Sequence, residues 1–188
     1  MKCADLSALL SSRESGDRSP HSKLINKTMS KIIIGVMGPG DANPDAIAVA
    51  FELGQLIAIE GWVLLTGGRD SGIMDAACKG AKEAGGLTVG ILPGPDGEGM
   101  SDAVDIPIFT GMGQARNNIN VLSSKVVIAC GMGPGTASEV ALALKAGKKV
   151  VLLGSSDEAV KFFQSLGKDD VFVASQPDEA IAIIKTII

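Results

Sequence analysis

The sequence predicts an α/β fold, a Rossmann-like, doubly wound and mostly parallel sheet of about seven strands with helices on both faces. Three observations predict it. From residue 31 onward, short apolar runs alternate with helical patterns. Most runs are apolar at consecutive positions, as expected for parallel strands covered on both faces. Glycine-rich turns follow several of the runs, as they do where strands lead into helices in such folds.

Each element is predicted from its own residues. The strands are the apolar runs at residues 32–36, 62–65, 87–92, 106–109, 126–129, 150–153 and 171–173. Helical patterns lie near residues 45–60, 72–84, 115–124, 137–147, 156–166 and 177–187. Strands that alternate with helices in this way indicate parallel strands joined by crossover helices.

Length and composition favour one globular domain. The 188 residues are 46% hydrophobic, which is enough for one well-buried core. No apolar stretch approaches the roughly 18–20 residues of a transmembrane helix, so no membrane contact is expected. Cys3, Cys78 and Cys130 are odd in number and lack C-x-x-C spacing. This cysteine usage favours a reducing, cytoplasmic compartment and predicts neither a disulfide framework nor a zinc site.

The charge balance argues against nucleic acid as a partner. The net charge is −4. Residues 1–28 hold five of the 17 basic groups and three of the 21 acidic groups, which leaves 12 basic against 18 acidic groups in the body of the chain. Non-specific binding of DNA or RNA requires a basic face that displaces counterions. An anion bound here would instead be held by local backbone dipoles and a few arginines.

Residues 1–28 differ from the rest of the chain. They are rich in serine, show no sustained period, and are followed by Met29 just before the first predicted strand. One explanation of this flexible leader is a tag or an upstream mis-called start. It is about as well supported as the two alternatives taken together, a natural extension and a targeting peptide. His21, the one histidine, lies in the leader and is assigned no function. Residues 29–188 are expected to form a single Rossmann-like domain.

Right-handed crossovers place the strand-to-helix loops at the carboxyl edge of the sheet, where ligands of such folds bind. The candidate loops are Gly38-Pro39-Gly40, Gly67-Gly68-Arg69-Asp70-Ser71-Gly72, residues 93–105, Gly111-Met112-Gly113 and residues 131–136. Glycines allow a phosphate to approach backbone N–H groups closely, and a helix N-terminus attracts anions. Tight turns in α/β proteins also use glycine without any ligand, but several such loops at one edge favour an anion site.

Two common nucleotide motifs fail. Gly35 to Gly40 has the spacing of a P-loop, but Asp41 and Ala42 replace its Lys and Ser or Thr. Gly131-x-Gly133 is followed by Thr136 where a dinucleotide fingerprint requires glycine. ATP hydrolysis of the P-loop type and NAD binding are therefore not expected.

Two arginines are candidate ligand-binding residues. Arg69 lies inside a glycine turn before a helix, where a guanidinium could grip a phosphate; the alternative is a surface arginine paired with Asp70 or Asp75. Arg116 opens the helix after Gly113, and the asparagines that follow it could initiate the helix instead of binding a ligand.

Glu139 has two interpretations. Thr136-x-x-Glu139 fits a capping box, in which Thr136 caps the helix and the Glu139 carboxylate accepts a hydrogen bond from the backbone N–H of Thr136. The alternative is a carboxylate with a catalytic or base-recognising role.

No nucleophile is accompanied by a histidine base, and no carboxylate and histidine cluster predicts a metal site. Methionines stand at or beside the loops, where they could be core or form a soft wall for a flat heterocycle: Met37, Met74, Met112 and Met132.

The chain resembles the superfamily of Rossmann-like proteins once described as lysine decarboxylases, which includes cytokinin-activating nucleotide phosphoribohydrolases. Those enzymes carry Pro-Gly-Gly-x-Gly-Thr-x-x-Glu, and here Gly135, Thr136 and Glu139 match while Gly131 and Met132 replace its first two residues. Their catalytic Arg-Lys pair becomes Arg116-Asn117. The resemblance thus keeps an Arg and a Glu but loses the lysine.

A more specific resemblance is to the molybdenum cofactor carrier proteins of algae and cyanobacteria. It covers residue 31 to the C-terminus and rests on five motifs in order: Gly-Val-Met-Gly-Pro-Gly at 35–40, Leu-Leu-Thr-Gly-Gly-Arg at 64–69, Leu-Pro-Gly-Pro-Asp at 92–96, Ala-Arg-Asn-Asn-Ile-Asn at 115–120 and Gly-Met-Gly-Pro-Gly-Thr at 131–136. It implies a homotetramer without a catalytic cycle that binds molybdenum cofactor, a phosphorylated pterin, protects it and delivers it to molybdoenzymes.

The resemblance also implies which residues bind the cofactor. The phosphate or oxyanion is expected at the glycine turns and the start of the helix, and the pterin or the molybdenum oxo ligands at Arg116, Asn117 and Glu139. The full predicted set is Gly38, Gly40, Gly67, Gly68, Arg69, Ser71, Gly72, Arg116, Asn117, Gly133, Pro134, Gly135, Thr136 and Glu139. The rival hypothesis is a nucleoside 5′-monophosphate phosphoribohydrolase with Arg116 and Glu139 as its catalytic residues.

Overall fold

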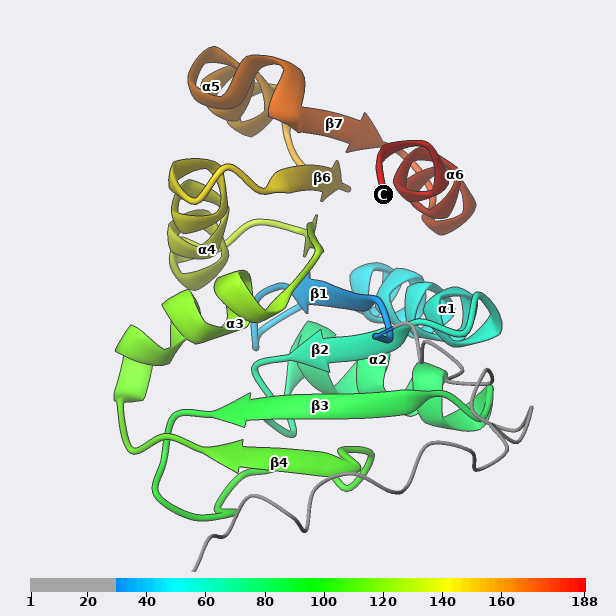
Figure 1. The fold of residues 1–188 in the computed structure, drawn as a ribbon, viewed down its shortest axis with the longest axis vertical. Helices are drawn as coiled ribbons and strands as arrows, with labels where there is room; N and C mark the ends of the chain where they lie inside the picture. Colours follow the sequence, from blue (N-terminus) through cyan, green and yellow to red (C-terminus); the bar gives the residue numbers. More distant parts are fainter. Residues whose placement is uncertain (1–29) are drawn as a thin grey trace, which may run out of the picture. The chain divides into compact units, whose positions relative to one another are not determined.

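A computed structural model describes residues 30–188, which form the predicted Rossmann-like α/β fold (Figure 1). The prediction of a leader at residues 1–28, with Cys3 and His21 in it, lies outside the described residues. The strands in chain order are β1 (Ile33–Met37), β2 (Val63–Thr66), β3 (Leu87–Leu92), β4 (Ile106–Phe109), β5 (Val126–Cys130), β6 (Lys149–Leu153) and β7 (Val171–Ala174). Each lies within one or two residues of its prediction.

The sheet is entirely parallel and has one reversal of strand order. Its seven strands stand in the order β4-β3-β2-β1-β5-β6-β7. The chain starts in the middle, where Ile34 of β1 pairs with Leu64 of β2 on one side and with Val126 of β5 on the other. It runs outward to β4 and then returns to β5. In open α/β sheets, ligands bind at the carboxyl ends of the strands where the order reverses, here between β1 and β5.

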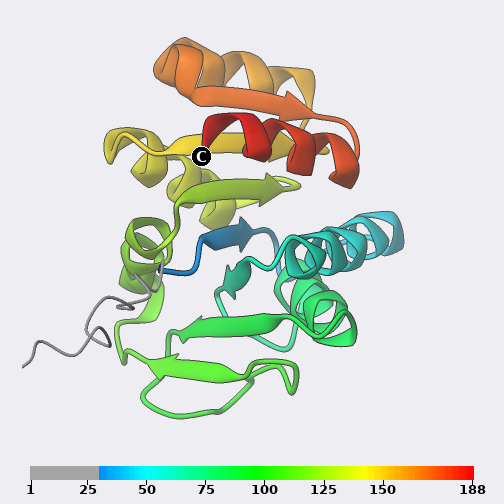
Figure 2. The same cartoon turned by 45° about the vertical axis from the view of Figure 1, so that its right-hand side comes forward.

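Within residues 30–188, six α-helices cover the two faces of the sheet: α1 (Pro44–Ile59), α2 (Gly72–Glu83), α3 (Asn117–Ser123), α4 (Pro134–Lys145), α5 (Asp157–Gly167) and α6 (Pro177–Ile187). Figure 2 shows α1 and α2 side by side on one face with α6 beside them, while α3, α4 and α5 lie on the other. None of the helices within the described range has the length and hydrophobicity needed to cross a bilayer.

The core consists of two layers, one on each face of the sheet. Ile34 and Ile128 pack with Leu53 of α1, whereas Met37 and Val127 belong to the layer on the other face. Neighbouring residues of a strand point to opposite faces, so a strand buried on both sides must be apolar at every position. This requirement explains the continuous apolar runs of the sequence.

Strand β4 is an exception to this burial. It lies at the edge of the sheet, and Ile106, Ile108 and Phe109 keep 44%, 43% and 46% of their surface exposed. The sequence prediction of coverage on both faces is wrong for this strand. No helix separates β3 from β4 along the chain, so no crossover helix packs over the edge.

Two predicted helices begin differently from the prediction. The helix expected over residues 115–124 starts as a 3₁₀ turn, η2 (Gly113–Arg116), and continues as α3. The helix expected from residue 137 begins at Pro134, with Gly133 as its N-cap. Proline fits the first helical position because its fixed φ suits the helix and no N–H is needed there. A second 3₁₀ turn, η3 (Lys168–Asp170), follows α5.

Candidate functional site

A pocket of about 220 Å³ opens at the carboxyl ends of β1, β2 and β5, beside the reversal of strand order. The loops after these three strands form it together with the first turn of α4 and side chains from η2 and α3. Its lining residues are Met37, Gly38, Pro39, Gly40, Gly67, Arg69, Met74, Gln114, Arg116, Asn117, Gly133, Pro134, Gly135, Thr136 and Glu139. The pocket therefore occupies the place where the topology predicts a ligand.

The first turn of α4 presents open hydrogen-bond donors to this pocket. The backbone N–H of Ala137 is bonded to Gly133 O at 2.8 Å, but those of Gly135 and Thr136 donate to no acceptor in the described residues. The Thr136 hydroxyl is buried and also has no partner there. A helix N-terminus with free amides and a positive dipole end attracts an anion.

Arg69 stands at the exposed mouth of the pocket. The described residues contain no ion pair of Arg69, and Asp75, one of its two proposed surface partners, is bonded to Lys79 at 2.7 Å and to Ser101 at 2.7 Å. Its turn is held instead through the backbone, because Asp70 N–H donates to Gly99 O at 2.9 Å. The guanidinium is thus available to a ligand.

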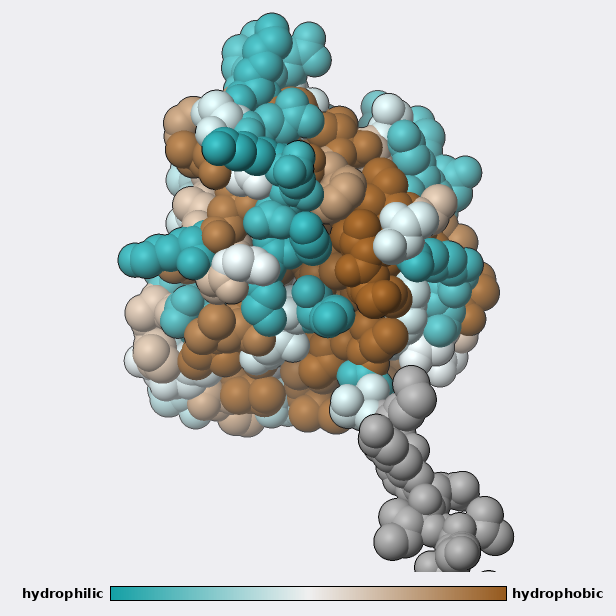
Figure 3. All heavy atoms as spheres, turned by 45° about the horizontal axis from the view of Figure 1, so that its top comes forward, coloured by the Kyte–Doolittle hydropathy of each residue, from teal (hydrophilic) through white to brown (hydrophobic). Residues whose placement is uncertain are grey.

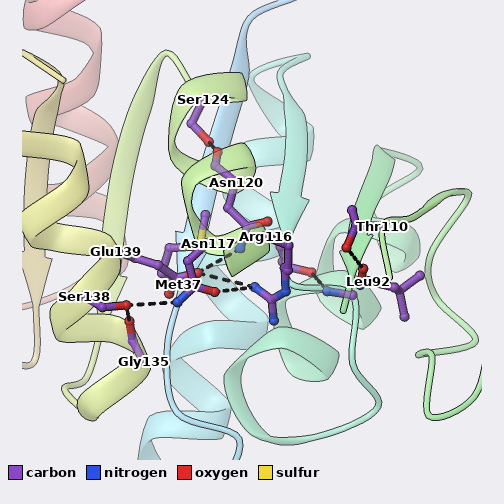
Figure 4. A network of polar contacts seen from close by, with 12 residues as sticks. Met37, Leu92, Thr110, Arg116, Asn117, Asn120, Ser124, Gly135, Ser138 and Glu139 are labelled. Atoms are coloured by element: carbon purple, nitrogen blue, oxygen red, sulfur yellow. Dashed lines mark hydrogen bonds and ion pairs between the residues drawn. The ribbon is translucent and has the colours of Figure 1, made fainter. Parts of the chain in front are cut away.

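Arg116 and Glu139 form the inner wall of the pocket, and both are only 6% exposed. Figure 4 shows them converging with Asn117 and Asn120 from two helices. Glu139 Oε1 accepts from Asn120 Nδ2 at 2.8 Å and lies 3.5 Å from Arg116 Nη1. Arg116 Nη1 also donates to Asn117 Oδ1 at 3.1 Å, and Asn117 Nδ2 donates to Ser138 Oγ at 2.9 Å.

Burial perturbs both members of this ion pair. It raises the pKa of Glu139, an effect that the hydrogen bond from Asn120 and the charge of Arg116 oppose. Burial also lowers the pKa of Arg116, which the Glu139 charge opposes and the nearby charge of Arg69 reinforces. The Arg116 charge therefore helps to keep the buried Glu139 carboxylate ionised in this environment.

A glycine at position 67 leaves the space that the Arg116 guanidinium occupies beside Gly67. A Cβ atom at Gly67 would come within 2.6 Å of Arg116 Nη2 and 2.8 Å of Met74 Sδ. Both contacts are too close for real atoms. This glycine therefore makes room for the guanidinium as well as for a ligand.

The capping-box interpretation of Thr136 and Glu139 is wrong. Because α4 begins at Pro134, Thr136 is its third residue and not its cap. The Glu139 carboxylate bonds to Asn120 and Arg116 from the neighbouring segment, and not to the Thr136 backbone. Asn117 begins α3 without a side-chain cap and instead links Arg116 to Ser138.

The pocket brings together most of the residues predicted from the sequence, but not all of them. Gly68, Ser71 and Gly72 do not line it. Gly72 has a φ of 54°, and a Cβ there would lie 2.3 Å from Pro39 O, so it serves the close contact between two loops. The candidate loops at residues 93–105 and 111–113 also lie outside the lining.

Four lining residues were not in the predicted set. Met37 and Met74 belong to the methionines noted beside the loops, whereas Met112 is 51% exposed and does not line the pocket. Pro39 lies inside a predicted loop between two predicted glycines. Gln114 follows a predicted loop directly, and no signal in the sequence singled it out.

The two cysteines of the described residues are not poised to act as thiolate ligands. Cys130 ends β5, is 1% exposed, and burial raises its pKa to about 12. Cys78 is also free and buried, with a pKa raised to about 11, first of all by burial. Both thiols stay protonated near neutral pH.

The model of the SLOG cluster4 family matches residues 31–181. An uncharacterized protein of Archaeoglobus fulgidus is 47% identical over 125 residues, which are 66% of this chain and 82% of that protein.

Two solved structures are similar over almost their whole length. The molybdenum cofactor binding protein of the phototrophic bacterium Rippkaea orientalis is 58% identical, with a TM-score of 0.82 over 85% of this chain and 99% of that one. The molybdenum cofactor carrier protein of Chlamydomonas reinhardtii is 60% identical, with a TM-score of 0.79 over 83% of this chain and 98% of that one.

Proposed function

The chain belongs to the SLOG cluster4 family, and from this premise we propose that it binds molybdenum cofactor, protects it and transfers it as a non-catalytic carrier. The two similar structures named for binding or carrying this cofactor support the proposal, because this chain covers nearly all of each. At about 60% identity the residues of a shared site are expected to have shared roles. The cofactor is thus carried cargo and not part of a catalytic cycle.

The observation that carries the assignment is the open first turn of α4 inside the pocket. The free N–H groups of Gly135 and Thr136 bind the phosphate or an oxo ligand, and Arg69 adds a positive charge at the mouth. Gly38, Gly40, Gly67 and Gly133 keep side chains out of the space around this anion, while Gly68, Ser71 and Gly72 shape the turn behind it. Arg116, Asn117 and Glu139 contact the pterin.

A carrier must also release its cargo. Main-chain amides and one exposed arginine provide reversible binding, whereas thiolate capture of molybdenum would be harder to reverse. Cys130 is buried and protonated, so the described pocket offers no thiolate to the metal. Modest affinity is therefore consistent with this site.

The direct test is a titration of the purified protein with the cofactor, comparing wild type with Arg69→Ala. Losing one partly solvated, charge-assisted contact should weaken binding by about five- to tenfold. Lys161→Ala is the matched control, because Lys161 is an exposed cation of α5 that does not line the pocket, and it should bind as wild type does. Equal weak binding by wild type and Arg69→Ala would defeat the assignment.

The second candidate function is a nucleoside 5′-monophosphate phosphoribohydrolase. One observation favours it: Arg116 and Glu139 both line the pocket, where they could act at the ribose anomeric centre. Asn117 in place of the lysine opposes it. Incubation with AMP distinguishes the two, because release of free adenine that Glu139→Ala abolishes would support the enzyme and not the carrier.

We also propose a cytoplasmic homotetramer that hands its cofactor to recipient molybdoenzymes. Apolar side chains lie open on β4 at the edge of the sheet, and Phe162 and Leu166 of α5 are 57% and 58% exposed. Figure 3 shows hydrophobic residues lying between hydrophilic ones on the surface in that view. Contacts between subunits would remove such surface from water. Light scattering after size-exclusion chromatography should give four times the mass of the chain, and a monomer would refute this.

A further inference from the structure

One oxygen of the buried Glu139 carboxylate is unused. Oε1 accepts from Asn120 and lies near Arg116, whereas Oε2 accepts no hydrogen bond from any described residue. Oε2 is not among the atoms sealed from solvent, although the residue as a whole is only 6% exposed. This oxygen therefore opens onto the pocket that Glu139 lines. A carboxylate oxygen is a strong acceptor and requires a donor when a ligand removes its water.

The Arg116 guanidinium beside it has unused donors. Its Nη1 donates to Asn117 Oδ1 and Glu139 Oε1, but Nε is buried with no partner and Nη2 donates to no acceptor among the described residues. Nη2 lies in the space that Gly67 leaves open by having no side chain. The inner wall thus presents an acceptor from Glu139 next to donors from Arg116.

The inner wall adds little attraction for a purely anionic ligand. The Arg116 and Glu139 charges largely cancel, so the inner wall adds little net attraction for an anion, unlike the α4 N-terminus and Arg69. A ligand that fills the pocket must therefore bring its negative group to the outer end and N–H donors to the Glu139 end. A neutral ring edge with adjacent N–H groups and a carbonyl satisfies both residues of the wall.

We propose that Glu139 Oε2 and Arg116 read the edge of a 2-amino-4-oxopyrimidine ring, the chemistry that pterins and guanine share. The carboxylate accepts from the 2-amino group, and the guanidinium donates to the carbonyl. The inference rests on the proposed function, since it names the part of the carried pterin that this wall selects. Glu139 is accordingly a specificity-determining residue at the same site.

The test uses two ligands that differ in one group. Pterin carries the 2-amino group, whereas lumazine carries a carbonyl in its place, which would face the Glu139 carboxylate with an acceptor. Fluorescence titration of the wild-type chain should show pterin binding roughly ten- to hundredfold more tightly than lumazine, as expected for a charged group left without its partner. Equal affinities, or no detectable binding of pterin, would overturn the proposal.

A variant and a nucleotide comparison extend the test. In Glu139→Gln the preference for pterin over lumazine should fall to a few-fold, because an amide oxygen is a weaker acceptor and its NH₂ can donate to the lumazine carbonyl. An undiminished preference in this variant would contradict the role of Glu139. If the variant fails to fold, the wild-type comparison still decides.

Guanosine and inosine 5′-monophosphates repeat the comparison on a purine, since inosine lacks the 2-amino group. Displacement of pterin by the guanine nucleotide alone supports recognition of the shared edge, and equal displacement by both contradicts it. A separate titration with molybdenum cofactor keeps the two proposals distinct. Cofactor binding without discrimination between pterin and lumazine would leave the carrier function standing and remove only this inference.

Discussion

Replacing Gly135 by alanine should stabilise the protein and weaken ligand binding at the same time. Gly135 is the second residue of α4, its φ is not positive, and a Cβ built on it meets no atom within 4 Å. The new methyl group therefore causes no clash within the protein. It would stand instead at the pocket surface, beside the amide to which the anion is proposed to bind.

The two effects have calculable sizes. Alanine in place of a strain-free glycine lowers the entropy of the unfolded chain and should raise the free energy of unfolding by about 0.4–1 kcal/mol. For a domain of this size that corresponds to an increase in Tm of about 1–4 °C. Obstructing charge-assisted hydrogen bonds to Gly135 and Thr136 N–H groups should weaken binding by roughly ten- to hundredfold.

Urea unfolding and a cofactor titration on the same preparation measure both effects. Gly97→Ala is the control, because Gly97 has no positive φ, a Cβ there would have its nearest neighbouring atom at 3.9 Å, and the residue lies outside the pocket. That variant should keep wild-type affinity. Unchanged affinity in Gly135→Ala would refute the placement of the anion at the α4 N-terminus, and a lower stability would refute the reasoning about the helix start.

Two further variants probe the structure that supports the pocket. Arg116→Met should lower the free energy of unfolding by about 3–5 kcal/mol at pH 7, because it leaves the Glu139 carboxylate buried without its cation. Its stability should recover as pH falls. Burial raises the pKa of Glu139 in the folded state above its value in the unfolded chain, so between these two pKa values the folded state binds a proton that the unfolded chain does not. Stability is therefore lost as pH rises from the unfolded-state pKa to the folded-state pKa. A loss that is equal at pH 5 and pH 7 in urea unfolding would contradict this. Gly72→Ala should lower the free energy of unfolding by about 1–3 kcal/mol or more, because its Cβ would lie 2.3 Å from Pro39 O. Gly147 has a similar positive φ but open space around it, so Gly147→Ala should lower the free energy of unfolding by only about 1–2 kcal/mol. Equal losses in thermal unfolding would show that the contact between loops contributes nothing.

The sequence by itself determined the sheet, its strands and the edge at which the pocket opens. Continuous apolar runs such as Val126 to Cys130 are typical of parallel strands that are buried on both faces, and the chirality of crossovers then directs the strand-to-helix loops to one edge. The glycines of three of these loops line the pocket for that reason. β4 departed from the pattern because no crossover helix joins β3 to β4 and covers this edge of the sheet.

The partners of the polar side chains were decided by the tertiary structure alone. Local spacing favoured Thr136 as a cap with Glu139 folded back onto it, but Pro134 starts the helix two residues earlier and turns Glu139 toward Arg116 and Asn120. Those residues are separated from it by 23 and 19 positions, a distance at which no local pattern operates. The Arg116–Glu139 ion pair on the inner wall follows from this packing, because an ion pair between segments so far apart in the chain forms only once both are docked on the sheet.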